Sequence, residues 1–177
     1  MIVLVGFMGA GKSTVGRSLA DRLGLPFLDS DTVIEERAGR SIAQIFASDG
    51  ESAFRALEAA TIADLLDGPS AVLSLGGGAC GNPTTRGRLA GHTVVHLEVS
   101  FDQALARVGA DPRRPVLAAP DLADRYAARQ ADYARVATVT VRTDARRPGE
   151  VAAEIAAALA ADAGRAARLV HVGPDGP

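Results

Sequence analysis

The sequence predicts an α/β fold, a three-layer α/β/α domain in which helices cover both faces of a five-stranded parallel sheet. Short apolar runs rich in β-branched residues alternate along the chain with segments whose apolar residues recur at helical spacing. Glycine or proline marks several of the junctions between these segments, as turns require. The 177 residues fit one domain, which we place at residues 1–162, and we expect residues 163–177 to form a flexible tail.

The first predicted strand, residues 2–5, leads directly into the stretch Gly6-Phe7-Met8-Gly9-Ala10-Gly11-Lys12-Ser13-Thr14. This stretch matches the complete phosphate-loop (P-loop) pattern G-x-x-x-x-G-K-[ST], in the strand-then-helix context that the pattern needs. A helix is predicted from Lys12 to Leu23, because its apolar residues have helical spacing and Gly24 is a stop signal.

The chemistry of this loop indicates that the protein binds a nucleoside triphosphate. Glycines let backbone N–H groups turn toward an anion, and the positive end of the following helix adds to the field there. Lys12 can reach the β- and γ-phosphates, and the Ser13 hydroxyl can bind Mg²⁺. We therefore expect the nucleotide to contact Gly9, Ala10, Gly11, Lys12, Ser13 and Thr14.

The next part of the chain is predicted to form a short strand, three helices and a buried strand. The strand Phe27–Asp29 ends on a carboxylate, and the buried strand Ala71–Leu75 runs into Gly76-Gly77-Gly78. A stop signal at Gly39 and a cap signal at Ser41 separate the first two helices. The helices are predicted at Thr32–Ala38, Ile42–Ala47 and Glu51–Leu66.

The remaining elements continue the alternation of strands and helices. A strand is predicted at Thr93–Val99, and a capping box of Ser100 and Gln103 opens a helix that ends at Val108. Residues 109–120 are rich in Gly, Pro, Asp and Arg, which predicts a mobile loop that serves as a lid. The last predicted elements are a helix at Asp121–Arg135, a strand at Thr138–Val141 and a helix at Val151–Ala161.

Composition and charge argue against several classes of protein. The net charge of -2 and the aromatic content of 4% argue against a broad nucleic-acid-binding surface, and no apolar segment has the length of a membrane-spanning helix. Cys80 is the only cysteine in the sequence, so we expect a buried, inert thiol and a cytoplasmic protein. His92 and His96 have a helical ligand spacing, but Thr93-Val94-Val95 between them is predicted as strand, so ordinary polar strand positions are favoured over metal ligands.

Two carboxylates follow the second predicted strand, at the edge of the sheet where ligands of parallel sheets bind. If the chain stays extended, Asp29 and Asp31 point the same way and are placed to serve Mg²⁺ and an acceptor hydroxyl. The alternative is that Asp31 begins the following helix, as its N-cap and first-turn acid. The spacing alone favours neither interpretation.

Glycines and arginines add to the same edge of the sheet. Three consecutive glycines after a buried strand indicate a tight turn or a close approach to the backbone. Arg55, Arg114 and Arg129 are of the type that holds a carboxylate or a transferring phosphoryl group, although a lone arginine is more often a solvated surface charge. Together these residues predict a small-molecule phosphotransferase, and they do not identify its acceptor.

With these residues assembled, residues 1–160 resemble the shikimate kinase family, which belongs to the nucleoside-monophosphate-kinase-like P-loop proteins. Many families share the P-loop, whereas its combination with the segments below is far more specific. The matching segments are Leu28-Asp29-Ser30-Asp31, Gly39-Arg40-Ser41-Ile42-Ala43, Ile45-Phe46, Gly50-Glu51, Phe54-Arg55, Glu58, Leu75-Gly76-Gly77-Gly78-Ala79 and Arg114-Pro115. The resemblance implies a P-loop kinase fold with a lid at about 109–120 and acceptor-binding helices within about 31–60.

The resemblance implies a monomer that transfers the γ-phosphoryl group of ATP to the 3-hydroxyl of shikimate, with Mg²⁺, in aromatic amino-acid biosynthesis. It implies that Asp31 holds the ring hydroxyls and helps accept a proton, and that Lys12 and Arg114 stabilise the transition state. Arg55 and Arg129 would bind the shikimate carboxylate. The acceptor site would also include Phe46, Phe54, Glu58, Gly76, Gly77 and Gly78, the nucleotide site Arg107, Arg114, Arg146, Arg147 and Pro148, and the Mg²⁺ site Ser13 and Asp29.

One segment departs from the family pattern, because Arg129-Gln130-Ala131-Asp132-Tyr133 keeps only the Arg and Tyr of the usual Arg-x-Pro-Leu-Tyr. The segment between Arg114 and Arg129 is also shorter than usual by a helical turn.

Two alternative functions stay open. A gluconate kinase of the same superfamily is disfavoured by the Gly-Gly-Gly run with Phe54-Arg55, and a non-catalytic nucleotide-binding module is disfavoured by the retained acceptor residues.

Overall fold

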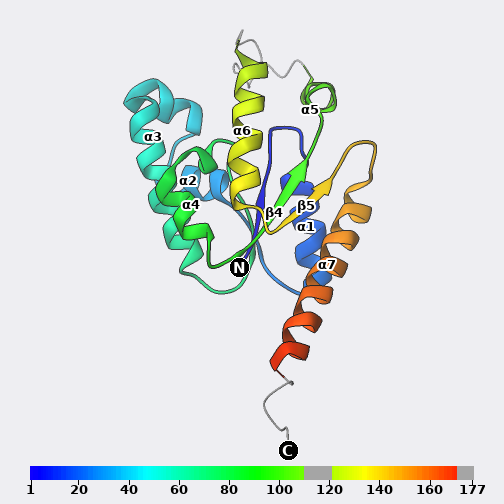
Figure 1. Cartoon of the computed structure of the whole chain (residues 1–177). Helices are drawn as coiled ribbons and strands as arrows, with labels where there is room; N and C mark the ends of the chain where they lie inside the picture. The colour runs from blue at the N-terminus through cyan, green and yellow to red at the C-terminus, as the bar shows by residue number, and fades with distance from the viewer. Residues whose placement is uncertain (110–120, 171–177) are drawn as a thin grey trace, which may run out of the picture.

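The computed structural model describes residues 1–109 and 121–170, and the side chains among them up to residue 161. In this part of the chain a parallel sheet of five strands has the order β2-β3-β1-β4-β5, which confirms the predicted sheet (Figure 1). The strands are β1 (Ile2–Val5), β2 (Phe27–Asp29), β3 (Val72–Ser74), β4 (Thr93–Glu98) and β5 (Val139–Arg142).

Helices cover both faces of the sheet, as the predicted three-layer architecture requires (Figure 1). On one face α1 (Lys12–Leu23) packs against α7 (Pro148–Val170). The other face carries α6 (Leu122–Val136), the 3₁₀ helix η1 (Ala79–Gly81) and α4 (Pro83–Leu89). The remaining helices are α2 (Ser30–Ala38), which packs against α3 (Ile42–Leu66), and α5 (Phe101–Val108), which follows β4.

The core lies around the central strands, whose apolar side chains are almost completely buried. The helix after the P-loop packs very closely on this core at Gly16, where a Cβ atom would lie 2.4 Å from Cε2 of Phe27 and 3.0 Å from Cδ1 of Leu4. This close packing fixes α1, and with it the P-loop, at the carboxyl end of β1. A separate small cluster of Ile34, Ile45 and Phe54 joins α2 to α3.

The two helices predicted within residues 42–66 are joined in the structure into one element, α3, which has a kink in it. Gly50 has φ 81° and ψ 172°, which is not helical, so the two predicted helices meet at a kink at this glycine. Ser41 and Gln44 form a capping box at the start of the element. The predicted cap at Ser41 is therefore confirmed.

The capping box predicted at Ser100 and Gln103 is wrong. The backbone N–H of Ser100 donates to the Asp144 carboxylate at 3.0 Å and its hydroxyl donates at 3.3 Å, so the hydroxyl does not cap the helix. Asp144, which is distant in sequence, accepts hydrogen bonds from both groups of Ser100. A local sequence pattern cannot predict such a partner.

Two further predictions about helices need correction. The last helix, predicted to end at Ala161, continues to Val170 through a sequence rich in alanine, the best helix former. Neither η1 nor α4 was predicted from the sequence. The start of α4 had a signal, because Asn82 caps it by accepting the N–H of Thr84 at 2.9 Å and Pro83 occupies its first turn.

Of the predicted lid at 109–120, the structure describes only Gly109, so Arg114 lies outside the described residues. Residues 171–177 of the predicted tail also lie outside them. None of the described helices combines the length and apolar character needed to cross a membrane.

Candidate functional site

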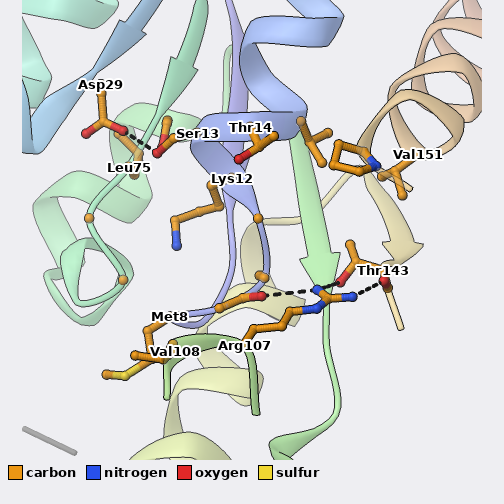
Figure 2. A pocket seen from close by; sticks show the side chains of 18 of the residues that line it. Met8, Lys12, Ser13, Thr14, Asp29, Leu75, Arg107, Val108, Thr143 and Val151 are labelled. Atoms are coloured by element: carbon orange, nitrogen blue, oxygen red, sulfur yellow. Dashed lines mark hydrogen bonds between the residues drawn. The ribbon is translucent and has the colours of Figure 1, made fainter. Parts of the chain in front are cut away.

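A cavity of about 680 Å³ opens along the carboxyl ends of the strands. The P-loop and the start of α1 form one wall, and residues after β2 and β3, from α5 and α6, and from the β5–α7 connection form the rest (Figure 2). Of the predicted site residues, those that line it are Gly9, Ala10, Gly11, Lys12, Ser13, Thr14, Asp29, Asp31, Gly76, Gly77, Arg107, Arg129, Arg146 and Pro148. The topology thus brings residues from most of the chain to one place.

The P-loop has the backbone that the motif predicts. Gly11 is the N-cap of α1 with φ 88° and ψ 18°, a left-handed conformation that suits glycine. No side chain within the described residues caps α1, and its first turn contains no acid, so the positive end of the helix faces the cavity. Lys12 Nζ donates to the carbonyl oxygens of Gly6 at 2.7 Å and Phe7 at 3.1 Å. The loop is therefore a cationic cradle for an anionic ligand.

Ser13 and Asp29 meet beside the P-loop. The Ser13 hydroxyl donates to Oδ2 of Asp29 at 2.9 Å (Figure 2). Oδ1 of Asp29 accepts the N–H of Asp31 at 3.1 Å. α2 begins at Ser30, so the chain is not extended between the two aspartates, and Asp29 rather than Asp31 is the N-cap. The N-cap prediction for Asp31 is wrong by two residues, although Asp31 does lie in the first turn. Carboxylate and hydroxyl oxygens are ligand types that suit Mg²⁺.

Asp31 lies against the glycine turn after β3, in a strongly acidic setting. A Cβ atom at Gly76 would lie 2.6 Å from Oδ1 of Asp31 and 2.9 Å from Oε1 of Glu58, so this glycine makes room for both carboxylates. Burial, followed by the charges of Asp29 and Glu58, raises the pKa of Asp31 to about 6. A carboxylate with this pKa is ionised at neutral pH and is a stronger base than an ordinary aspartate.

Arg55 reaches the other end of the same turn from α3. Its Nη1 donates to Oε2 of Glu58 at 2.7 Å, and its Nη2 lies 3.3 Å from Oε1 of Glu51. Burial disfavours the charged form of Arg55, but these acidic partners leave its pKa above the ordinary value. Burial raises the pKa of Glu58, and the ion pair with Arg55 offsets this only in part. The Arg55 side chain is 30% exposed, so it is held by its acidic partners and is still accessible.

The aromatic residues predicted for the acceptor site flank Arg55 on α3. The Phe54 ring is 5.0 Å from the Arg55 guanidinium carbon and 4.6 Å from the Phe46 ring, measured to ring centroids. Phe46, Phe54, Arg55, Glu58 and Gly78 are not among the residues that line the cavity. They are instead joined to its rim through the contacts of Arg55 and Glu58 with the glycine turn.

Arg129 and Tyr133 reach the middle of the turn from α6. Nη1 of Arg129 lies 3.5 Å from the position of a Cβ atom at Gly77, and its guanidinium carbon lies 5.6 Å from the centroid of the Phe7 ring. Tyr133 donates from Oη to the Gly77 carbonyl at 2.6 Å. The structure therefore places both Arg129 and Arg55 beside the glycine turn.

Arg107 binds the opposite side of the P-loop. Its Nη1 donates to the Gly9 carbonyl and to Oγ1 of Thr143, both at 3.1 Å, and its Nη2 donates to the Thr143 carbonyl (Figure 2). Arg146 forms an ion pair with Glu154 at 2.6 Å and lines the cavity. Arg147 is exposed and does not line the cavity, and its backbone N–H donates to Glu150. Thr143, which the sequence analysis missed, follows β5 at the edge where ligands bind.

Asp132, one of the residues that depart from the family pattern before Tyr133, forms ion pairs in the structure. Asp132 forms ion pairs with Arg135 at 3.2 Å and with Arg86 at 3.7 Å. Nη1 of Arg86 also donates to the carbonyl oxygens of Cys80 at 2.6 Å and Gly81 at 2.9 Å. Asp132 thus connects α6 to η1, directly after the glycine turn.

Cys80 is buried, as predicted. Burial raises the pKa of its thiol to about 12, which keeps the thiol protonated and inert.

Comparisons with known proteins agree on one family. The family model described as "Shikimate kinase" matches residues 8–160. A shikimate kinase of Mycobacterium avium is 50% identical over 170 residues, which cover 93% of this chain and 97% of the relative. The structure of "Shikimate kinase from Acinetobacter baumannii in complex with shikimate" matches with a TM-score of 0.87 and 37% identity, covering 91% of this chain and 93% of the other.

A gluconokinase structure from Sinorhizobium meliloti is also similar, with a TM-score of 0.55 and 20% identity, covering 95% of each chain. This likeness extends to the fold alone. The gluconate-kinase alternative therefore gains no support for its acceptor from this comparison.

Proposed function

The chain belongs to the shikimate kinase family, and from that premise we propose how its residues perform the reaction. The protein is a phosphotransferase that transfers the γ-phosphoryl group of ATP to the 3-hydroxyl of shikimate, giving shikimate 3-phosphate and ADP in aromatic amino-acid biosynthesis. The proposed roles rest chiefly on one observation. The side chains of Asp31, Arg55 and Arg129 surround one glycine turn, and Gly76 and Gly77 of this turn line the same cavity as the P-loop.

We propose that Arg55 and Arg129 bind the carboxylate of shikimate. Guanidinium groups bind carboxylates through two parallel hydrogen bonds, and these two arginines reach the turn from different helices. Glu58 holds Arg55 in place at 2.7 Å, and Phe46 and Phe54 pack beside it. The backbone of Gly76, Gly77 and Gly78 provides polar groups for the ring hydroxyls, without side chains to exclude the ring.

The Asp31 carboxylate is the proposed base. The oxygen of the 3-hydroxyl forms a bond to the γ-phosphorus while the bond from that phosphorus to the β,γ-bridging oxygen breaks, and ADP leaves. The proton of the hydroxyl passes to Asp31, whose pKa of about 6 suits this role at neutral pH. The transition state of phosphoryl transfer is loose, so most of the catalysis comes from positioning and charge.

The nucleotide occupies the P-loop side of the cavity in this proposal. Lys12, with Arg114 from the lid, balances the negative charge of the transferring group. Arg107, Arg146, Arg147 and Pro148 flank the adenine. Arg107 lies near the end of α5, and the other three lie in the β5–α7 connection and at the start of α7. Ser13 and Asp29 would hold Mg²⁺, because their oxygens lie 2.9 Å apart at the loop. The metal ion would neutralise phosphate charge when bound.

The proposed unit is a cytoplasmic monomer with shikimate as its acceptor, not nucleic acid or a membrane. We place its catalytic domain at residues 1–162, with the lid at about 109–120 and the acceptor-binding region at about 31–60, and a tail at 163–177 whose first part is the end of α7. Lid closure would keep water from accepting the phosphoryl group.

The function is tested by an ADP-release assay with MgATP and each of four acceptors: shikimate, gluconate, AMP and water. We expect turnover with shikimate far above that with the other three. Turnover with gluconate or AMP instead would retain the P-loop chemistry and overturn the acceptor site. ATP binding without turnover on any acceptor would favour the alternative of a non-catalytic nucleotide-binding module.

A further inference from the structure

We propose that Tyr133 and Ser30 are positioning residues that hold the Gly76–Gly78 turn in the conformation that binds shikimate. The inference rests on the proposed function, because it concerns the same acceptor site. Tyr133 is 1% exposed and Ser30 is 0% exposed, so neither is placed to contact the acceptor from the cavity. They act on the site through the backbone of the turn.

The two side chains bind different residues of the turn, Ser30 its first glycine and Tyr133 its middle one. Tyr133 Oη donates to the Gly77 carbonyl at 2.6 Å, and Ser30 Oγ accepts the N–H of Gly76 at 3.0 Å. Between them, the Gly76 carbonyl accepts the N–H of Ala79 at 3.0 Å. Each peptide group is planar, so one hydrogen bond fixes the direction of both its C=O and its N–H. These three bonds together orient the three consecutive peptide groups from Leu75 to Gly78.

Such a clamp is needed because the turn consists of glycine. Glycine has more conformational freedom than any other residue, so a free turn of three glycines would lose much entropy on binding a ligand. The clamp imposes this ordering during folding, and the acceptor then meets a turn that is already arranged. The same turn lies against the side chains of Asp31 at Gly76, Arg129 at Gly77 and Arg55 at Gly78, each within 3.5 Å of the position of a Cβ atom there. Its conformation therefore sets the spacing of the whole acceptor site.

Tyr133 suits this role because its hydroxyl is a permanent donor. Burial raises the pKa of Tyr133 above its ordinary value, so the hydroxyl stays protonated. Its ring packs in the core, 5.2 Å from the His96 ring between centroids. The substitution Tyr133→Phe keeps this ring and removes only the bond to the turn.

The same helix offers a matched control. Tyr126 also lies on α6, and its Oη donates to a backbone carbonyl, that of Val99, at 2.8 Å. Tyr126→Phe thus removes a bond of the same type and nearly the same length, away from the glycine turn. A general loss of stability in α6 would affect both variants.

The first experiment compares the two variants in steady-state kinetics of the full chain. We expect Tyr133→Phe to raise the KM for shikimate about tenfold, the usual effect of one lost hydrogen bond, with the KM for ATP unchanged. We expect Tyr126→Phe to change neither. An equal rise in both variants, a parallel rise in the KM for ATP, or an unchanged KM for shikimate in Tyr133→Phe would overturn the positioning role.

The second experiment needs no ligand and separates this inference from the proposed function. Amide hydrogen exchange of Gly76 and Ala79 should be faster in Tyr133→Phe than in the native chain, and faster still when Ser30→Ala is added. Unchanged exchange would overturn the clamp even if shikimate is the substrate. Faster exchange in the variants, together with a native chain that proves inactive with shikimate, would support the clamp and contradict the proposed function.

Discussion

The guanidinium group of Arg55 occupies the space that a side chain at Gly78 would need. Both Nη atoms of Arg55 lie 2.8 Å from the position of a Cβ atom at Gly78. The backbone of Gly78, with φ -97° and ψ -12°, is open to any residue, so this glycine is required by the neighbouring arginine and not by its own conformation. The glycine turn and the arginine of α3 are therefore one structural unit.

This relationship predicts the effect of Gly78→Ala. The added methyl group should displace Arg55, and a displacement of about an ångström is enough to raise the KM for shikimate by on the order of ten- to a hundredfold. Gly81→Ala is the matched control, because nothing lies within 4 Å of a Cβ atom there. Steady-state kinetics of both variants provide the measurement. Similar values of KM in the two would contradict the account of Arg55.

Asp31 predicts an acid limb in the pH profile. Burial and then the neighbouring carboxylates of Asp29 and Glu58 raise its pKa to about 6, and a base must be ionised to accept a proton. The kcat/KM for shikimate should therefore fall as the pH falls through about 6. Asp31→Asn should lower kcat by on the order of a hundredfold or more and remove this limb. A native profile that stays flat from pH 8 to pH 5 would rule out Asp31 as the base.

The raised pKa of Asp31 also predicts that Asp31→Asn increases the stability of the fold. The folded pKa of Asp31 lies above the ordinary 3.8, so the carboxyl group favours folding below pH 3.8 and loses this contribution as the pH rises through about 6. The variant should exceed the native chain in free energy of unfolding by about 1–3 kcal/mol at pH 8, and by less at pH 4. Urea unfolding at the two pH values measures this difference. A less stable variant at pH 8 would show that the carboxylate is not strained.

Gly16→Ala should destabilise the fold through the packing of α1. The new Cβ atom would lie 2.4 Å from a ring carbon of Phe27, in a buried contact that has little room to relax, and overpacking of this kind costs about 1–3 kcal/mol. Gly87→Ala in α4 is the control, because a Cβ atom there meets nothing within 4 Å and alanine favours the helix. Thermal unfolding should show a lower Tm only for Gly16→Ala. An unchanged Tm would mean that α1 can shift freely on the sheet.

Much of the fold follows from local patterns in the sequence. The strands and most helices have clear apolar periodicity, and the P-loop has a pattern that defines its own strand and helix. The elements that were missed or misjudged depend on contacts that are distant in sequence. Ser100 turns to Asp144 instead of capping α5, and no pattern near Ser100 predicts that bond. The short helix α4 has only a weak apolar pattern, although Asn82-Pro83 was a usable signal.

The site was predictable in its residue types and less so in its contacts. Parallel strands bring the P-loop, Asp29 and the glycine turn to one edge, so their proximity follows from the fold class. The N-cap role of Asp29 depends on where α2 begins, which sequence patterns define poorly. The roles of Ser30 and Tyr133 were hidden for a different reason. A buried hydroxyl that binds a backbone group of another element has no signature of its own in the sequence.

Binding of the shikimate carboxylate by Arg55 is tested most directly by calorimetric titration of shikimate into the native chain and into Arg55→Lys. Lysine keeps the charge beside Glu58 and loses the two-pronged hydrogen bonding of arginine. Arg37→Ala is the control, since Arg37 lies on α2 and forms an exposed ion pair with Asp64. We predict that Arg55→Lys weakens shikimate binding about tenfold or more and leaves ATP binding unchanged, while Arg37→Ala changes neither. If Arg55→Lys binds shikimate as tightly as the native chain, or loses only ATP affinity, Arg55 does not bind the carboxylate of shikimate.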